Sequence, residues 1–310
     1  EVRLGPAEGG GFASKLQLAA ARGAAAARLG RAWRLAGHLG WYTNNSGCLR
    51  LLGLEGFARG GWRCHFEPLA PLAGREPRRP GCLRRPPPFP RAAVSWGAWQ
   101  AALLRPSRAL RPGLAHLAER AGYDTSRPLL AAHVRRGDKT TNVYNRYHAG
   151  RAYVAEALRA AKELQLCRQP QAPCQLFVAS DAPTALGEVR EAVREFGASG
   201  FVEVIGLASS ASQRHSAVGV ELARASLGAE AYGMALEVLF DLEVLSRALV
   251  LVATLASQVA RVAASVGLAH GSLLRAVALD ATNLQEMRAL FAGLGVRVDD
   301  VPWWPPQAYD

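Results

Sequence analysis

Short apolar runs alternate with amphipathic stretches through the second half of the chain. Four runs have the composition of buried strands: "PLLAAHV" (128–134), "CQLFVASD" (174–181), "FVEVIGL" (201–207) and "LVLVAT" (249–254). Between and after them, residues 151–166, 182–197, 231–248 and 257–267 carry the spacing of helices. Strands alternating with helices of this length indicate βαβ units in a parallel sheet covered on both faces. We therefore predict a Rossmann-type, doubly wound α/β domain over residues 128–310.

The first part of the chain is less regular. Residues 5–39 are small and Ala-rich, which predicts a Gly-rich turn running into one or two helices. Residues 66–90 are rich in Pro and Arg without periodicity, as in a surface connector, and helical spacing resumes over 94–123. We expect residues 1–127 to form a smaller, mostly helical or irregular N-terminal lobe.

Polar side chains follow the predicted strands. The first strand runs directly into Arg135, Arg136, Asp138 and Lys139, and the second ends in Asp181. The carboxyl ends of parallel strands meet at one edge of the sheet, where α/β proteins bind their ligands. Taken alone, the charged stretch after the first strand could equally be a solvated turn. Its convergence with a second segment favours an anion site.

A third segment points to the same edge. Ser257 and Gln258 follow the fourth strand and open a helix, and Arg261 lies one turn further on. Free backbone N–H groups and the helix dipole make such a start favourable for phosphate, although Ser257 could also be a simple helix cap. Together the three segments predict a ligand that carries a pyrophosphate.

Two further residues have a simpler alternative. His133 could be a hydrogen-bonded core imidazole. Asp241 lies in the mostly apolar "ALEVLFDLEVLS", and a buried carboxylate requires a partner. A polar helix face around Asp241 is the competing interpretation.

Charge and cysteine content narrow the class. The net charge of +12 favours acidic or phosphorylated partners, although the excess of positive residues is mostly Arg. The chain contains no basic tract interleaved with aromatic residues, so nucleic-acid binding is not expected. The five cysteines are irregularly spaced, which argues against a zinc site. Cys167 and Cys174 bracket a Pro-containing loop that a disulfide could close, although free thiols are the alternative. With the sequon at Asn44, this leans towards a secretory compartment.

No metal or membrane span is expected from the sequence. No D-x-D occurs, so charge on a leaving pyrophosphate would be met by Arg135, Arg136 and Lys139. No run of about 18 uncharged apolar residues is present. Membrane attachment, if any, is expected from a segment outside this chain.

Several motifs occur in the order found in one enzyme family. "HVRRGDK", "VASDAP" and "ATLASQVARVA" resemble the three motifs of the α-1,6-fucosyltransferases. "GGGFASKLQ" and "GGWRCHFEPL" resemble the Gly-rich donor loop and the Gly-Gly-Trp segment of that family. The resemblance implies a GT-B-like, inverting, metal-independent glycosyltransferase without a cofactor. Its substrates would be GDP-fucose and a glycan or glycoprotein acceptor, by family the N-glycan core GlcNAc in the Golgi lumen.

The resemblance also implies roles for individual residues. Arg135 would bind the β-phosphate, with Arg136 and Lys139 beside it, while His133 and Asp241 would hold the guanine base. The remaining positions implied to contact the donor are Asp138, Asp181, Ser257 on phosphate, Gln258, Arg261, the loop residues Gly11, Phe12 and Ala13, and Phe57.

The chain departs from the family at several positions: Ala13 replaces a Gly of the donor loop, Phe57 stands where the family has a Tyr, and two further changes bear on catalysis. Val143 stands where the family places a Glu, the proposed general base, and Ala182 replaces the second Asp of an Asp-Asp pair. Asp138, His148 or a carboxylate from a distant loop could substitute as the base. Two alternatives therefore stay open: a GDP-sugar-binding module without turnover, and a fucosyltransferase for a protein O-linked or chitooligosaccharide acceptor.

Overall fold

A single parallel sheet of five strands forms the centre of the second half of the chain. The computed structural model describes residues 2–4, 33–37, 82–83, 100–136 (without 102, 103 and 109), 147–169, 171–208, 230–254 and 257–280. The strands of this sheet are β4 (Leu129–Val134), β5 (Cys174–Ser180), β6 (Val202–Ile205), β7 (Val250–Ala253) and β8 (Arg275–Ala278). All neighbours pair in parallel, in the order β6-β5-β4-β7-β8. Four strands were predicted from the sequence; β8 was not.

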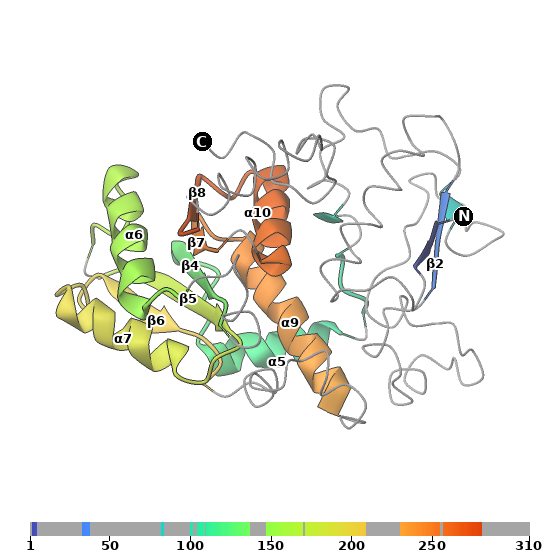
Figure 1. The fold of residues 1–310 in the computed structure, drawn as a ribbon, viewed down its shortest axis with the longest axis horizontal. Helices are drawn as coiled ribbons and strands as arrows, with labels where there is room; N and C mark the ends of the chain where they lie inside the picture. Colours follow the sequence, from blue (N-terminus) through green and yellow to red (C-terminus); the bar gives the residue numbers. More distant parts are fainter. Residues whose placement is uncertain are drawn as a thin grey trace.

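Helices cover both faces of this sheet. Figure 1 shows α6 (Gly150–Glu163) and α7 (Ala185–Glu195) on one face, and α5 (Arg111–Ala121), α9 (Glu230–Ser246) and α10 (Gln258–His270) on the other. Alternation along β4 explains the two layers, because successive side chains of a strand point to opposite faces. Leu130 and Ala132 pack with α6 and α7, whereas Leu129 and Ala131 pack with the other three helices. The predicted doubly wound α/β domain is confirmed.

The strand order places a topological switch point between β4 and β7. From β4 the chain winds outward through β5 and β6, then returns through α9 to the other side of β4 and continues through β7 and β8. The helices that follow β4 and β7, α6 and α10, lie on opposite faces of the sheet, and α/β proteins bind their ligands at the carboxyl ends of the strands at such a point. The residues predicted to bind a phosphate follow these strands.

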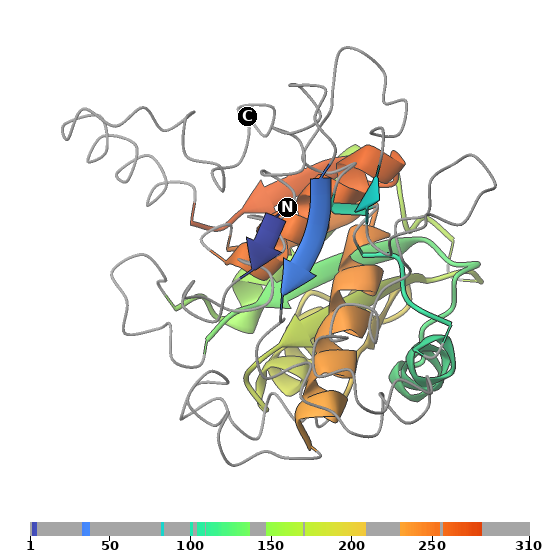
Figure 2. The ribbon, with the colours of Figure 1, turned by 90° about the vertical axis from the view of Figure 1, so that its right-hand side faces the viewer.

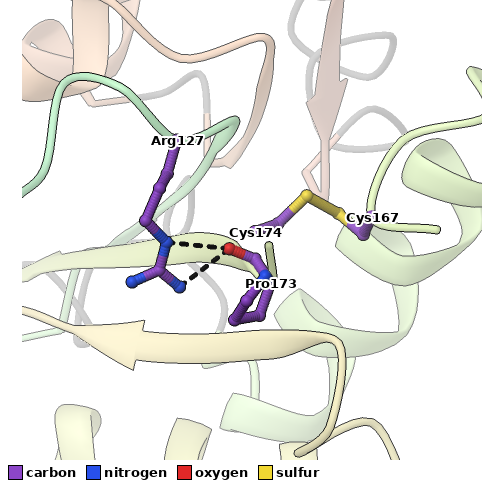
Figure 3. The surroundings of a disulfide bond; sticks show 4 residues. All are labelled: Arg127, Cys167, Pro173 and Cys174. Atoms are coloured by element: carbon purple, nitrogen blue, oxygen red, sulfur yellow. Dashed lines mark hydrogen bonds between the residues drawn. A yellow bond between two sulfur atoms is a disulfide. The ribbon is translucent and has the colours of Figure 1, made fainter. Parts of the chain in front are cut away.

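The opposite, amino-terminal edge of the sheet is tied together by a disulfide and an arginine (Figure 3). Cys167 and Cys174 are bonded, which confirms the disulfide over the free-thiol alternative. Arg127 donates two hydrogen bonds to the carbonyl of Pro173, at 2.9 Å from Nε and 2.7 Å from Nη2. These contacts fix the segment that enters β5.

Three short strands are described in the N-terminal part. β1 (Val2–Leu4) lies parallel to β2 (Trp33–Gly37), as Figure 2 shows, and β3 (Cys82–Leu83) pairs with β2 in the antiparallel sense. The helix expected to reach residue 39 is therefore wrong for residues 33–37. Trp33 and Leu35 alternate with Arg34, and this two-residue period suits a strand. Residues 82–83 of the expected connector form strand β3, and the other expectations for residues 1–99 lie outside the described residues.

No helix in the described part of the chain has the length and apolar character required to cross a bilayer.

Candidate donor-binding site at the carboxyl edge of the sheet

The end of β4 is fixed by the residues that end β5. The Ser180 hydroxyl donates to the Val134 carbonyl at 2.7 Å, and the Asp181 carboxylate accepts the backbone N–H of Arg136 at 2.8 Å. Asp181 also pairs with the Arg135 guanidinium. Asp181 is buried, whereas the Arg135 side chain keeps 22% of its surface exposed. Arg135 is therefore oriented by the protein and still accessible to a ligand.

The Arg136 side chain turns towards α7. Its two terminal nitrogens each lie 2.5 Å from an oxygen of Glu188, and one also donates to the His148 carbonyl at 3.3 Å. The guanidinium lies over the Tyr147 ring, 4.6 Å from its centre. Burial is the largest single effect and opposes its charge, but the hydrogen bonds to Glu188 and the charge of that carboxylate, with smaller effects of two tyrosines, together raise the pKa of Arg136. The same hydrogen bonds lower the pKa of Glu188.

His133 and Asp241 lie on the same side of the sheet. By alternation, His133 shares the face of Leu129 and Ala131, which α9 covers, and Asp241 lies on α9. Burial, helped by the charge of Arg135, lowers the pKa of His133 to about 3, so its imidazole is neutral. Burial, helped by the Glu237 carboxylate, raises the pKa of Asp241 well above its ordinary value.

Several buried polar atoms at this edge lack a hydrogen-bond partner within the described residues, among them His133 Nδ1, Arg136 Nε, Thr254 Oγ1 and Gln258 Oε1. Thr254 directly follows β7, and Gln258 is the first residue of α10. Buried polar atoms in proteins almost always have a partner, and exceptions point to a role in binding or catalysis. His133 lies near the end of β4, and Thr254 and Gln258 follow β7, so these atoms favour a polar binding site at the switch point.

The start of α10 adds a further arginine, Arg261, to those that follow β4. Ser257 is buried immediately before the helix, and the buried Arg261 lies one turn into it. Burial lowers the pKa of Arg261 to about 10, against the opposing effect of Asp280, so the guanidinium is charged at neutral pH. Sequence reasoning missed Asp280, which is buried just after β8. Its signal was "VALD", an apolar run ending in Asp like "VASD" at β5.

The structure thus brings residues of all three motifs to one edge of the sheet. The following predicted site residues lie outside the described part of the chain: Asp138, Lys139, Gly11, Phe12, Ala13 and Phe57. Val143 lies there as well. Among the described residues, no group of three or more His, Cys, Asp or Glu side chains is close enough to hold a metal ion.

A doubly wound sheet with arginines at its switch point is the arrangement in which α/β enzymes bind phosphorylated ligands. The family model for the N-terminal and catalytic domains of α-(1,6)-fucosyltransferases matches residues 94–269 of this chain, which is more than half of it. The chain belongs to the α-(1,6)-fucosyltransferase family and is a fucosyltransferase, as its motifs predicted.

Similar folds occur among solved structures of one enzyme, NodZ α-1,6-fucosyltransferase. The structure soaked with GDP-fucose is 15% identical, with 88% of this chain and 93% of that chain covered and a TM-score of 0.47. The selenomethionine NodZ from Bradyrhizobium is 16% identical, with 88% and 92% covered and a TM-score of 0.46. NodZ co-crystallised with GDP is 15% identical, with 82% and 88% covered and a TM-score of 0.43. No curated protein sequence matches the chain.

Proposed function

We propose that this chain transfers fucose from GDP-fucose to a hydroxyl of a glycan, with inversion at the anomeric carbon and without a metal ion. Family membership supports the reaction class. One observation supports the location of the donor: cationic side chains and unsatisfied buried polar atoms gather where β4 and β7 diverge.

Arg135 is proposed to hold the β-phosphate together with Lys139. Asp181 orients the Arg135 guanidinium, and a charge-assisted hydrogen bond from a preoriented arginine is strong in a partly dry site. The start of α10, with Ser257 and Gln258, offers N–H groups to the second phosphate, and Arg261 adds charge from one turn further on.

His133 and Asp241 are proposed to hold the guanine base. The His133 imidazole is neutral, so it can donate at one nitrogen and accept at the other. The Asp241 carboxylate can accept from two N–H groups of guanine. Asp138, the Gly-rich loop at Gly11, Phe12 and Ala13, and Phe57 are proposed to complete the donor site.

In the proposed reaction, the acceptor oxygen forms a bond to the anomeric carbon as the bond from that carbon to the β-phosphate oxygen breaks. GDP leaves with the electron pair, and the acceptor proton passes to a base. A general base contributes about 10²–10⁴ in rate. Because Val143 cannot serve, we propose that Asp138, His148 or a carboxylate from a distant loop takes this proton.

The acceptor is proposed to be the core GlcNAc of an N-glycan, joined by an α-1,6 linkage in the Golgi lumen. The disulfide between Cys167 and Cys174 fits an oxidising compartment. A protein O-linked or chitooligosaccharide acceptor is the second possibility for turnover. Val143 favours one further candidate, a donor-binding module that does not transfer.

Calorimetric titration with GDP, followed by an assay for GDP release from GDP-fucose with a mixed glycan pool, tests the proposal. Arg135→Ala should weaken GDP binding about 100-fold, as expected for losing a charge-assisted bond to phosphate in a partly buried site. The matched control is Arg159→Ala, whose side chain pairs with Glu156 and Glu163 on the surface of α6. Acceptor-dependent release would support transfer, and GDP binding without release would support the donor-binding module. Equal loss of GDP affinity in both variants would contradict the assigned site.

A further inference from the structure

Arg136 differs from its neighbour Arg135 because its guanidinium is buried and paired with a carboxylate inside the protein. Its side chain is 9% exposed, and both terminal nitrogens contact Glu188. A phosphate could reach these two terminal nitrogens only by displacing a carboxylate that already holds them in the bidentate geometry arginine favours. Arg135, by contrast, keeps 22% of its side-chain surface exposed.

Glu188 joins three elements of the fold. Besides Arg136, which follows β4, its carboxylate accepts the Thr184 hydroxyl at 2.9 Å, just before α7. It also accepts the backbone N–H of Gly150, the first residue of α6. A Cβ atom at Gly150 would lie 3.0 Å from the Cβ of Glu188, so the glycine permits this close approach. The carboxylate is thus a common anchor for the end of β4 and the starts of both neighbouring helices.

The backbone of Arg136 is held from the other side. Its N–H donates to Asp181 at 2.8 Å, and Asp181 pairs with the guanidinium of Arg135. A continuous series of contacts therefore runs from Glu188 through Arg136 and Asp181 to Arg135. The chain also returns to this point after the next ten residues, because Arg136 contacts both Tyr147 and His148.

We propose that Glu188 and Arg136 are positioning residues for the donor site: their ion pair fixes the end of β4 and thereby the phosphate-binding guanidinium of Arg135, and Arg136 does not itself bind phosphate. This rests on the proposed function, in which Arg135 binds the β-phosphate of GDP. Misplacing a binding group by about 1 Å can cost up to about 100-fold in activity, so loss of this ion pair should weaken donor binding by Arg135.

Glu188→Gln tests the proposal because the two roles of Arg136 predict opposite signs. If the pair positions Arg135, GDP affinity measured by calorimetry falls about tenfold. If Arg136 is a phosphate ligand, removing its carboxylate partner frees the guanidinium, and GDP affinity holds or rises; that result would overturn the proposal. Arg136→Lys keeps the charge but loses the bidentate pair, so it should match Glu188→Gln, and the double variant should be no worse than either.

Glu203→Gln is the control, because Glu203 forms an ion pair with Arg127, also at 2.5 Å, away from the donor site. Glu203→Gln should leave GDP affinity unchanged. Hydrogen exchange adds a readout that needs no ligand: exchange in residues 129–136 should be about tenfold faster in Glu188→Gln and Arg136→Lys and unchanged in Glu203→Gln. If the wild-type protein does not bind GDP, the proposed function fails, while the exchange data still test the pair. Unchanged exchange in both variants would overturn the positioning role.

Discussion

Replacing Asp241 by Asn should stabilise the fold and weaken donor binding at the same time. Asp241 lies among the mostly apolar residues of α9, and Glu237 lies one helical turn away. Both raise its pKa, burial more than Glu237, so ionisation at neutral pH costs folding free energy. Asn has nearly the same shape and carries no charge.

The magnitude follows from linkage. Each unit by which the folded-state pKa exceeds the unfolded value costs about 1.4 kcal/mol once the carboxyl is ionised in both states. Because the folded form holds its proton longer, wild-type stability should fall as pH rises from the ordinary value of 3.8 to the raised pKa and stay level above it. Asp241→Asn should therefore match the wild type near pH 4 and be the more stable of the two proteins at pH 7.

Denaturant unfolding from pH 4 to pH 8, paired with GDP calorimetry, provides the measurement. GDP affinity of Asp241→Asn should fall about tenfold or more if Asp241 accepts hydrogen bonds from guanine as proposed. Glu243→Gln is the control on the same helix; its partner Arg247 lies at 2.9 Å on the surface, and the change should cost under about 1 kcal/mol. The reasoning would be refuted if Asp241→Asn were less stable than the wild type at pH 7, or if the difference did not widen between pH 4 and pH 7.

Three further predictions concern the rest of the described fold. Gly206→Ala should destabilise the protein by about 2 kcal/mol in denaturant unfolding, because φ is +155° and a Cβ would lie 2.8 Å from a β5 carbonyl. Gly187→Ala, in α7 with no atom within 4 Å of the added Cβ, should instead stabilise it by about 0.5–1 kcal/mol. Equal effects of the two substitutions would contradict this reasoning. Replacing Cys167 and Cys174 by Ser should cost about 2 kcal/mol for a sequence separation of 7, with no added effect of reductant on the variant. His133 should make the stability fall as pH drops from 6.5 towards about 3, because its imidazole binds a proton in the unfolded state but not in the folded state. His133→Gln should reduce this dependence of the unfolding free energy on pH. An unchanged dependence would exclude His133 as its source.

The sheet could be predicted from the sequence because its strands are buried on both faces. Runs such as "LLAAHV" and "CQLFVAS" contain almost no polar residue, and the helices between them keep a clear periodicity. Strand β8 was not predicted, because "RAVA" at the sheet edge is only partly buried and too short to give a clear apolar pattern. Strand β2 was missed for a related reason: its five residues follow an Ala-rich segment that resembles a helix.

Part of the candidate site could also be predicted from the sequence, and part could not. That Arg135, Asp181 and Ser257 share one edge follows from strand order alone, and the sequence pattern was sufficient to predict it. The pairing of Arg136 with Glu188 was not predictable, because the two residues are 52 positions apart and nothing local distinguishes Arg136 from Arg135. Which of two adjacent arginines points to solvent is decided by tertiary packing.

The strand order also bears on how the site comes into existence during folding. Leu130 of β4 pairs with Val250 of β7, 120 residues further along the chain. Until β7 has been synthesised and has crossed back, the central strand presents an unpaired apolar edge, and such edges invite association between chains. Contacts this distant in sequence also slow folding. A chain that ends before β7 would lack one of the two strands that flank the proposed donor site and leave one edge of β4 unpaired, so we expect nucleotide binding only after β7 and α10 have been made.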